Sequence, residues 1–450
     1  MAQRALDVWM NGELVGVWYA SRSGTPLFRY ETDWLTSPRA RPLSLSLPFV
    51  PGNEPHRGEV VDSWFDNLLP ESAAIRQRIR RRFATVSTGA FDLLTAIGRD
   101  CVGAVQLTTS GTEPPDARRI EADPITDSQV AAILRGVTEV RPLGMDDHPD
   151  EFRISIAGAQ EKTALLRLRG RWHVPSGSTP TTHMLKLPLG LIGHMRADLR
   201  DSVENEWLCM HLLGELGLPV PNTEIGRFSD GVGEEKALVV ERFDREFAPV
   251  SGSHRKWITR LPQEDFCQAL GVPAARKYES DGGPGIPEGL SLLAGGVRPT
   301  EDSVVFAKAQ LVFWLLAAPD GHAKNFSIFL RRDGYVLTPL YDVISAWPVV
   351  GRGANQWAQQ KVKLAMAVRG TRPHRELNRI AYRHWVQLAS QTGARDALDQ
   401  LAAMVHGADA ALHRVESTLP RGFPEQVWTT ISRGVLSQRE RFLAGRDAAR

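Results

Sequence analysis

One segment, residues 320–342, limits the fold and chemistry of this chain more than any other. It begins with Asp-Gly-His-Ala-Lys-Asn at 320–325, continues through an apolar run, passes Asp333 and Gly334, and ends at Asp342. An Asp-Gly pair between two apolar runs is a strong signal for a β-hairpin. With Asp333 and Gly334 as the two loop residues, counting outward along both strands predicts that Asn325 lies opposite Asp342.

Residues opposed across a hairpin lie about 4.5–5.5 Å apart, so the Asn325 amide and the Asp342 carboxylate could share a hard cation. Asp320 stands five residues before Asn325, after a helix predicted over 301–316. The same spacing occurs in protein-kinase catalytic loops, where the Asp accepts a hydroxyl proton and the Asn and a later Asp hold Mg²⁺. The segment favours phosphoryl transfer, although an ordinary hairpin with polar flanks also accounts for these residues.

A second feature is Lys186, within the apolar run 183–188. A lysine in such a strand must either face solvent or meet a counter-charge. The phosphates of ATP would serve, and Glu204 and Glu206 in the following predicted helix are candidate ion-pair partners between which the sequence does not choose. A lysine on an edge strand facing water is the alternative.

Residues 154–163 form a turn of small residues between two predicted strands, and its main-chain amides could approach phosphate oxygens. The candidate nucleotide-binding residues there are Ala157, Gly158, Ala159, Gln160 and Lys162. The run 239–245 ends the same region where a kinase hinge would pass, and its main chain could hydrogen-bond adenine. A plain turn and an interdomain crossover are the respective alternatives.

Composition excludes several other classes of protein. The 450 residues are 42% apolar and 24% charged, which is ordinary for globular domains, and 54 basic against 52 acidic side chains give no chain-wide basic field for nucleic acid. The three cysteines are too far apart for a CxxC pair and too few for a disulfide framework, which favours a reducing cytoplasm. No apolar run approaches the about 20 residues that span a bilayer, so we expect no membrane insertion.

The predicted fold class is α+β and protein-kinase-like, in three parts. We expect an N-terminal β-rich subdomain over 1–110 that opens with two strands around Asn11 and Gly12, a small α+β nucleotide lobe over 125–245, and a large, mostly helical lobe over 246–450. Residues 110–124 are expected to be a linker. The arginine-rich stretch 76–82 is interpreted as a solvated helix face rather than a contact to DNA phosphates.

Several of these segments together resemble the HipA family of bacterial serine/threonine kinase toxins. The resemblance rests, in chain order, on Ser-Ile-Ala-Gly-Ala-Gln-Glu-Lys-Thr-Ala-Leu-Leu at 155–166, His-Met-Leu-Lys-Leu-Pro at 183–188, Glu-Asn-Glu at 204–206, Val-Glu-Arg-Phe-Asp-Arg at 240–245, the segment 320–325, and Tyr-Asp-Val at 341–343. Residues 65–70 and 91–94 are similar to the N-terminal region of that family. The resemblance covers nearly the whole chain.

The resemblance implies a cytoplasmic kinase toxin that uses ATP and Mg²⁺. Its partner would be a small HipB-type helix-turn-helix antitoxin, and it would meet operator DNA only through that complex. Its substrate would be a serine on a translation component, in known members an aminoacyl-tRNA synthetase, with growth arrest and persistence as the result.

The resemblance also assigns roles by position. Asp320 would be the catalytic base, Asn325 and Asp342 the Mg²⁺ ligands, and Lys186 the phosphate-binding lysine. Glu241 and Phe243 would lie at the adenine hinge. Ser155 matches a serine whose autophosphorylation silences the enzyme. His322 and Lys324 are further candidates on the nucleotide side of the site, and His322 is interpreted as orienting the loop rather than carrying a proton, because Asp320 already fills that role.

One position departs from the family, and two other functions compete with the toxin. The family commonly has Asn two residues before the catalytic Asp, where this chain has Ala318. The alanine side chain lacks the hydrogen-bond donor of an asparagine amide, but the change takes away none of the candidate metal ligands. A small-molecule kinase with the same core is the first alternative, and a non-catalytic regulatory subunit bound to an antitoxin is the second.

Overall fold

The structure is a computed structural model that describes residues 4–20, 25–138, 160–192, 197–250, 252, 255–353 and 355–449. The chain divides into two compact units. The first comprises Met1–Leu187, Gly226–Ala275 and Ile328–Asp333, and the second comprises Pro188–Ile225, Arg276–Ser327 and Gly334–Arg450. Each unit is therefore assembled from separate stretches of sequence.

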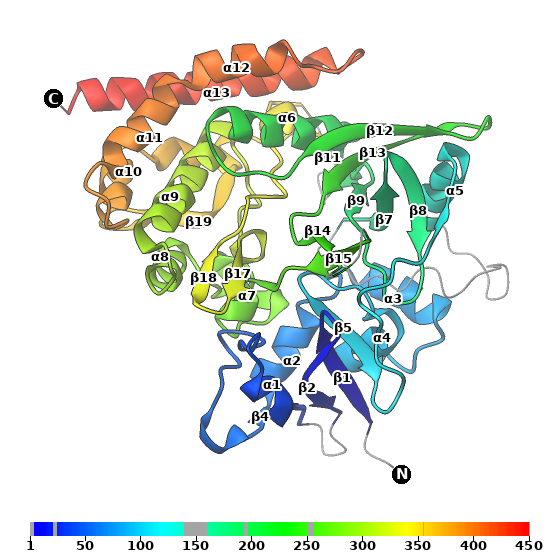
Figure 1. Cartoon of the computed structure of the whole chain (residues 1–450). Coiled ribbons are helices and arrows are strands. Elements are labelled where there is room, and N and C mark those ends of the chain that lie inside the picture. Colours follow the sequence, from blue (N-terminus) through cyan, green and yellow to red (C-terminus); the bar gives the residue numbers. More distant parts are fainter. Residues whose placement is uncertain are drawn as a thin grey trace. The chain divides into compact units, whose positions relative to one another are not determined.

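The first unit opens with a five-stranded antiparallel sheet in the order β4-β3-β2-β1-β5 (Figure 1). Its strands are β1 (Ala5–Met10), β2 (Glu13–Tyr19), β3 (Leu27–Tyr30), β4 (His56–Arg57) and β5 (Val105–Thr109). The predicted turn is confirmed, since Asn11 and Gly12 join β1 to β2 with φ values of 49° and 84°. Both residue types tolerate positive φ, which a two-residue hairpin turn of this kind requires.

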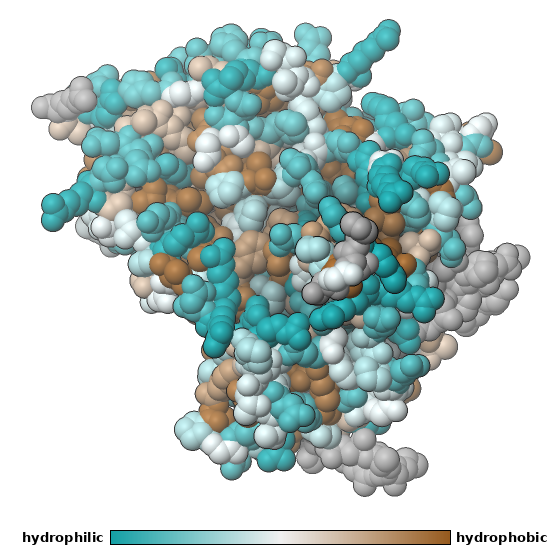
Figure 2. Space-filling view, viewed as in Figure 1, coloured by the Kyte–Doolittle hydropathy of each residue, from teal (hydrophilic) through white to brown (hydrophobic). Residues whose placement is uncertain are grey.

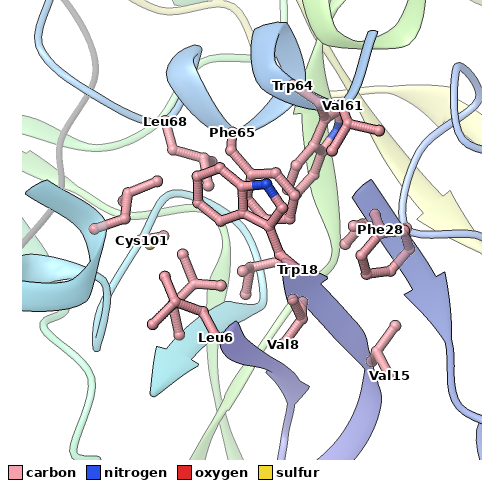
Figure 3. Packing of buried hydrophobic residues seen from close by; sticks show 14 of the residues in the cluster. Leu6, Val8, Val15, Trp18, Phe28, Val61, Trp64, Phe65, Leu68 and Cys101 are labelled. Carbon is pink, nitrogen blue, oxygen red and sulfur yellow. The ribbon is translucent and has the colours of Figure 1, made fainter. Parts of the chain in front are cut away.

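Helices and loops supply the other side chains of this first core. The helices are α1 (Thr32–Thr36), α2 (Glu59–Asp66), α3 (Ala73–Arg82) and α4 (Ala90–Ile97). Trp18 of β2 stacks on Phe65 of α2 with ring centroids 3.9 Å apart and ring planes within 4° (Figure 3). The arginine-rich α3 begins at Ser72, whose hydroxyl accepts from Ile75 N at 3.4 Å, and none of its residues is buried.

A six-stranded sheet follows, in the order β12-β13-β9-β7-β8-β6. Its strands are β6 (Ala122–Pro124), β7 (Lys162–Leu168), β8 (Arg171–Pro175), β9 (His183–Lys186), β12 (Thr223–Ser229) and β13 (Glu234–Glu241). Helix α5 (Asp127–Thr138) places Val130 and Leu134 in one core with Leu165 and Leu185 of the sheet. The central strand β9 is hydrogen-bonded on both sides, to β7 and β13.

The expected linker at 110–124 is partly wrong, because its last three residues form β6. They pair with β8, and Ile125 N donates to Trp172 O at 2.9 Å directly beyond the strand. The main-chain bonds of an edge strand do not depend on apolar side chains, and an edge tolerates a proline such as Pro124. The remaining elements in this part of the chain are β14 (Arg245–Pro249), β15 (Lys256–Arg260), β16 (Gln263–Asp265) and α7 (Phe266–Ala269).

The second unit is mainly helical. Its helices are α6 (Ser202–Glu215), α8 (Ile286–Ala294), α9 (Pro299–Leu316), α10 (Tyr382–Ser390), α11 (Ala397–His406), α12 (Ala408–Glu416) and α13 (Glu425–Asp447). Its short strands are β10 (Gly190–Ile192), β11 (Ala197–Leu199), β18 (Gly334–Leu337), β19 (Lys363–Arg369) and β20 (Pro373–Glu376). Strand β17 (Ser327–Arg331) leads into β18.

Helix α9 is the centre of the helical unit. It contacts α8, α10, α11 and α13, and most of its residues are buried. A helix that is apolar on all sides must be surrounded by other elements to be stable in water. The helix ends at Leu316, and Asp320 follows it after three further residues.

The described surface carries no single large apolar face. Its exposed large apolar side chains come from separate elements, with Val232 and Val86 the most exposed at 91% and 77%. Figure 2 shows polar and apolar residues interspersed on the face that it draws. Within the described ranges, no helix has the length and apolar character needed to cross a membrane.

Candidate active site

The end of α9 is fixed by a later segment of the chain. Ala317 closes the helix with a left-handed φ of 51°. The final carbonyl groups accept hydrogen bonds from residues 345–347: Trp347 Nε1 donates to Leu315 at 2.9 Å, Ser345 Oγ to Leu316 at 2.6 Å and Ala346 N to Ala317 at 3.1 Å. Carbonyl groups at a helix C-terminus have no partner within the helix. The segment that follows Asp342 therefore supplies these partners and fixes the point from which the Asp320 loop starts.

The loop 320–325 is closed by hydrogen bonds of its own. His322 N donates to Asp320 O at 2.8 Å, and Asn325 N donates to His322 O at 2.9 Å. The side-chain amide of Asn325 donates to Asp320 O at 2.6 Å. Gly321 is required by close packing, because a Cβ at this position would lie 2.4 Å from a ring carbon of Phe313. The resulting tight turn brings Asp320 and Asn325 together.

Asp320 differs from its neighbours in exposure. Its side chain is 52% exposed, whereas His322, Lys324 and Asn325 are only 3%, 6% and 5% exposed. The Tyr278 hydroxyl donates a hydrogen bond to Oδ1 of Asp320, and His322 Nε2 lies 3.7 Å from the same oxygen. A solvent-accessible carboxylate with fixed neighbours has the geometry of a general base for a hydroxyl that binds from outside.

Asp342 meets this loop through its main chain. Its φ of 62° lies in the left-handed region, which residues other than glycine adopt rarely and Asn and Asp more often than the rest. The main-chain oxygen of Asp342 lies 3.5 Å from Asn325 Nδ2. The neighbouring Tyr341 donates its hydroxyl to Lys324 O at 2.8 Å, and its hydroxyl lies 2.6 Å from Ser327 Oγ. These contacts bring Asn325 and Asp342 into one site.

The donor set at this site fits Mg²⁺. This ion takes oxygen ligands, and proteins often hold it with one or two carboxylates together with the phosphates of a nucleotide. In the described part of the chain, no group of three or more His, Cys, Asp or Glu side chains is arranged to hold a metal ion. The Asn325 amide oxygen and the Asp342 carboxylate are oxygen donors of the kind that Mg²⁺ takes.

The predicted hairpin register is wrong by two residues. The residues between β17 and β18 are Arg332 and Asp333, and Thr338 N donates to Ser327 O at 3.0 Å. Gly334, with a φ of 136°, takes the last position of the turn, where glycine is common, instead of a central one. A shift of two residues keeps each side chain on its predicted face of the strand. Asn325 therefore does not pair directly with Asp342, and the two meet through the contacts described above.

The nucleotide-lobe candidates lie in the first unit. Lys186 is 4% exposed on the central strand β9, in register with Leu238 on one side and with Lys162 on the other. Gln160 Nε2 donates to Leu187 O at 2.6 Å, which ties the segment directly before β7 to the residue that follows β9. The candidate residues Ser155, Ala157, Gly158 and Ala159 lie outside the described residues.

The hinge candidates follow β13. Glu241 is the exposed last residue of this strand, and Phe243 packs edge-on against Phe329 with ring centroids 5.8 Å apart. Between them, Arg242 N donates to Thr182 O at 2.8 Å. Glu204 and Glu206 lie in the second unit, on α6, and each is 2% exposed.

Directly after Glu241, a buried cluster of charges joins the N-terminal subdomain to the six-stranded sheet. Asp100 receives hydrogen bonds from Arg245 at 2.9 Å and from Arg260 at 3.2 Å, and Arg242 bonds to Asp244 at 2.8 Å. Burial alone would raise the pKa of Asp100, but the guanidinium groups of Arg245, Arg242 and Arg260 lower that pKa below its ordinary value. The cluster fixes the chain on both sides of the hinge candidates.

Sequence analysis missed the residues that position the loop. Tyr278 and Ser345 lie far from Asp320 in the sequence and belong to none of the motifs singled out there. Asn205 stands between the two glutamates that were singled out, but nothing local marked it as the partner of Ser345. The carboxylate at Asp320 and the amide at Asn325 became candidates because their spacing matches that of kinase catalytic loops.

The fold and the Asp320 loop define a kinase-like enzyme, and comparison with known proteins identifies the family. The HipA N-terminal domain model matches residues 6–108, and the HipA-like C-terminal domain model matches residues 154–414. The chain belongs to the HipA family.

Individual relatives agree with this assignment. "Putative kinase Y4mE" of Sinorhizobium fredii is 34% identical over 351 residues, covering 77% of this chain and 78% of that protein. The serine/threonine-protein kinase toxin HipA of Shewanella oneidensis is 31% identical over 377 residues, covering 80% of this chain and 76% of that protein. A solved complex of Shewanella oneidensis MR-1 HipA, HipB and operator DNA contains a chain that matches with a TM-score of 0.78 and 25% identity, over 98% of both chains.

These matches confirm three expectations. The resemblance to the HipA family, the α+β kinase-like fold, and the enzyme class, a serine/threonine protein kinase, are all as predicted from the sequence.

Proposed function

We propose that this protein is an ATP-dependent serine/threonine kinase that acts as the toxin of a toxin–antitoxin pair. The observation that carries the proposal is the arrangement in the second unit, where the half-exposed Asp320 carboxylate stands on a loop whose Asn325 lies beside Asp342. Phosphoryl transfer requires a base for the acceptor hydroxyl and ligands for the cation that binds the phosphates. These three side chains supply both.

In the proposed reaction, Asp320 accepts the proton of an acceptor serine hydroxyl. The serine oxygen bonds to the γ-phosphorus of ATP, the bond from that phosphorus to the bridging oxygen breaks, and ADP leaves. Asn325 and Asp342 would hold Mg²⁺, which when bound neutralises charge on the phosphates. His322 and Lys324, both buried in the loop, would keep its shape beside the nucleotide.

In the first unit, Lys186 and Lys162 are the proposed phosphate contacts. They stand opposite each other on adjacent strands, so their side chains lie on the same face of the sheet. The main chain around Ala157, Gly158, Ala159 and Gln160 would approach the phosphates, and Glu241 and Phe243 would border the adenine. A buried lysine gains most from a charged partner because its own desolvation is costly.

The biological setting is proposed from the family. The Shewanella oneidensis relative is named a kinase toxin, and its solved complex contains HipB and operator DNA. For this chain we propose a HipB-type antitoxin as partner and contact with operator DNA through that complex. Its substrate would be an aminoacyl-tRNA synthetase, with growth arrest and persistence as the result. Phosphorylation of Ser155 would inactivate the enzyme. All three cysteines are free and buried, which suits the reducing cytoplasm in which we place the enzyme.

The test is phosphate transfer from γ-labelled ATP to the purified chain and to proteins of a cell extract, with the phosphorylated residues located by mass spectrometry. We expect phosphoserine in wild type and none above background in D320A. The exposed turn residue Asp333 provides the matched control, since D333A removes a carboxylate outside the loop. Label found only on a small molecule would favour a small-molecule kinase.

A growth experiment tests the second alternative. Induced wild type should arrest growth, whereas induced D320A should not. Equal arrest by both would favour a non-catalytic regulatory subunit and contradict the proposed function.

A further inference from the structure

The Asp320 carboxylate has a partner that the proposed reaction does not yet use. Tyr278 lies between α7 and α8, 42 residues before Asp320, and its hydroxyl donates a hydrogen bond to Oδ1 of Asp320. Nothing in the pattern around Tyr278 marked it as part of the site. Its contacts with the neighbouring main chain and rings place it there.

The main chain on both sides of Tyr278 is anchored. Lys277 O accepts from Ala323 N at 3.3 Å, which joins this stretch to the catalytic loop itself. Tyr278 O accepts from Asp281 N at 3.0 Å and from Gly283 N at 2.9 Å. Gly283 permits this turn, because a Cβ there would lie 1.8 Å from Arg276 O. The turn is thus tight and has little freedom to move.

The next residue fixes the turn to a neighbouring strand. The Glu279 carboxylate accepts a hydrogen bond from Ala367 N of β19 at 2.5 Å, and its other oxygen lies 3.2 Å from Arg369. Its side chain is 9% exposed. A largely buried carboxylate bonded to a strand amide and to a guanidinium is a strong anchor.

The ring of Tyr278 is also held. It packs edge-on against the His322 ring, with centroids 4.9 Å apart and planes at 82°, and Lys277 Nζ lies 5.3 Å from its centroid. Edge-to-face contacts between rings are more favourable than the burial of their surface area alone would give. The hydroxyl is therefore presented to Asp320 by a ring that packs on the same loop.

We propose that Tyr278 is a positioning residue for phosphoryl transfer: its hydroxyl holds the Asp320 carboxylate in the one orientation in which it accepts the acceptor's proton. The inference rests on the proposed function of Asp320 as the base. Tyr278 acts through Asp320 and contributes to the transfer step, not to the binding of ATP.

A purely structural role explains the ring but not the hydroxyl. Tyr278 is only partly buried, so its hydroxyl could be hydrated and has no need of a protein partner. Asp320 is 52% exposed and likewise has access to water. Two groups that could each remain solvated are instead bonded to each other at the loop that carries the base.

The test is Y278F, which retains the ring and its packing on His322 and removes only the hydroxyl. The matched control is Y335F, since Tyr335 donates its hydroxyl to Leu292 O at 2.6 Å in the same unit and away from the loop. The readout is the initial rate of phosphate incorporation into the chain's own residues from γ-labelled ATP, measured over a range of ATP concentrations. Melting temperatures of all variants establish that they are folded.

We expect Y278F to lower the maximal rate about 10- to 100-fold, as small displacements of a catalytic group do. The ATP concentration at half-maximal rate should stay within about twofold of wild type, because nucleotide contacts are unchanged. Y335F should match wild type in both. A maximal rate of Y278F equal to or above that of wild type would overturn the inference. So would a change confined to a higher ATP concentration at half-maximal rate.

The same experiment separates this inference from the proposed function. If D320A abolishes labelling and Y278F does not slow it, only the role of Tyr278 fails. If D320A labels as fast as wild type, Asp320 is not the base, and both claims fail.

Discussion

Asn205 and Ser345 exchange two hydrogen bonds: Asn205 Nδ2 donates to Ser345 O, and Ser345 N donates to Asn205 Oδ1, each at 2.8 Å. Both residues are at most 1% exposed. The pair joins α6 to the segment that follows Asp342. Since the Ser345 hydroxyl also bonds to Leu316 O, this asparagine supports the end of α9 from which the Asp320 loop starts.

N205A should therefore lower the free energy of unfolding by more than the truncation of an exposed asparagine does. It leaves a buried N–H and a buried C=O of Ser345 without partners, each at a cost of about 1–3 kcal/mol. We expect the free energy of unfolding in urea to fall by about 2–5 kcal/mol. N378A, which truncates an exposed asparagine, is the control. A loss in N205A no larger than that in N378A would contradict this account of the pair.

The buried cluster after the hinge predicts a second stability effect. D100N removes the negative charge that Arg245 and Arg260 face, and breaking a buried ion pair from one side costs about 3–5 kcal/mol. Urea unfolding of D100N against wild type measures this loss, with D333N as the exposed control. Equal loss in both variants would show that the charge of Asp100 does not hold the cluster together.

A third prediction concerns pH. Burial raises the pKa of Glu264 from 4.5 to about 7. The hydrogen bonds that its carboxylate accepts from Ser44, Leu45 and Trp64 lower the pKa but do not offset the effect of burial. Between pH 4.5 and about pH 7, Glu264 holds a proton in the folded chain that it releases in the unfolded chain. The contribution of Glu264 to the free energy of unfolding is therefore present below about pH 4.5 and lost as pH rises through 7.

E264Q should remove this part of the pH dependence. Between pH 5 and pH 8, the free energy of unfolding of wild type should fall by up to about 3 kcal/mol more than that of E264Q. Chemical denaturation at both pH values measures the difference. Parallel pH profiles for the two proteins would mean that Glu264 does not titrate in this range.

The sequence predicted the parts of the site that depend on short spacings. Asp320 and Asn325 share one loop of six residues, and the tight turn that joins them needs only local hydrogen bonds and the small Gly321. The turn at Asn11 and Gly12 was predictable for the same reason, since its residue types allow the required φ values.

The register of the β17–β18 hairpin was not predictable in this way. The Asp-Gly pair fits either the two central positions of a turn or its last two, and only the main-chain bonds in the structure distinguish them. Tyr278 and Asn205 were missed because their partners lie 42 and 140 residues away in sequence. Such contacts depend on tertiary packing, which leaves no local pattern.

The central claim is that Asp342 and Asn325 hold the cation on which phosphoryl transfer depends, and D342A tests it most directly. The measurement is the initial rate of phosphate incorporation from γ-labelled ATP as Mg²⁺ is titrated, with D333A as the control. We predict that D342A loses at least about 100-fold in rate at every Mg²⁺ concentration, since removal of one electrostatic group at a reaction centre costs about 10²–10³, while D333A follows wild type. A D342A curve that coincides with the D333A curve would contradict the claim.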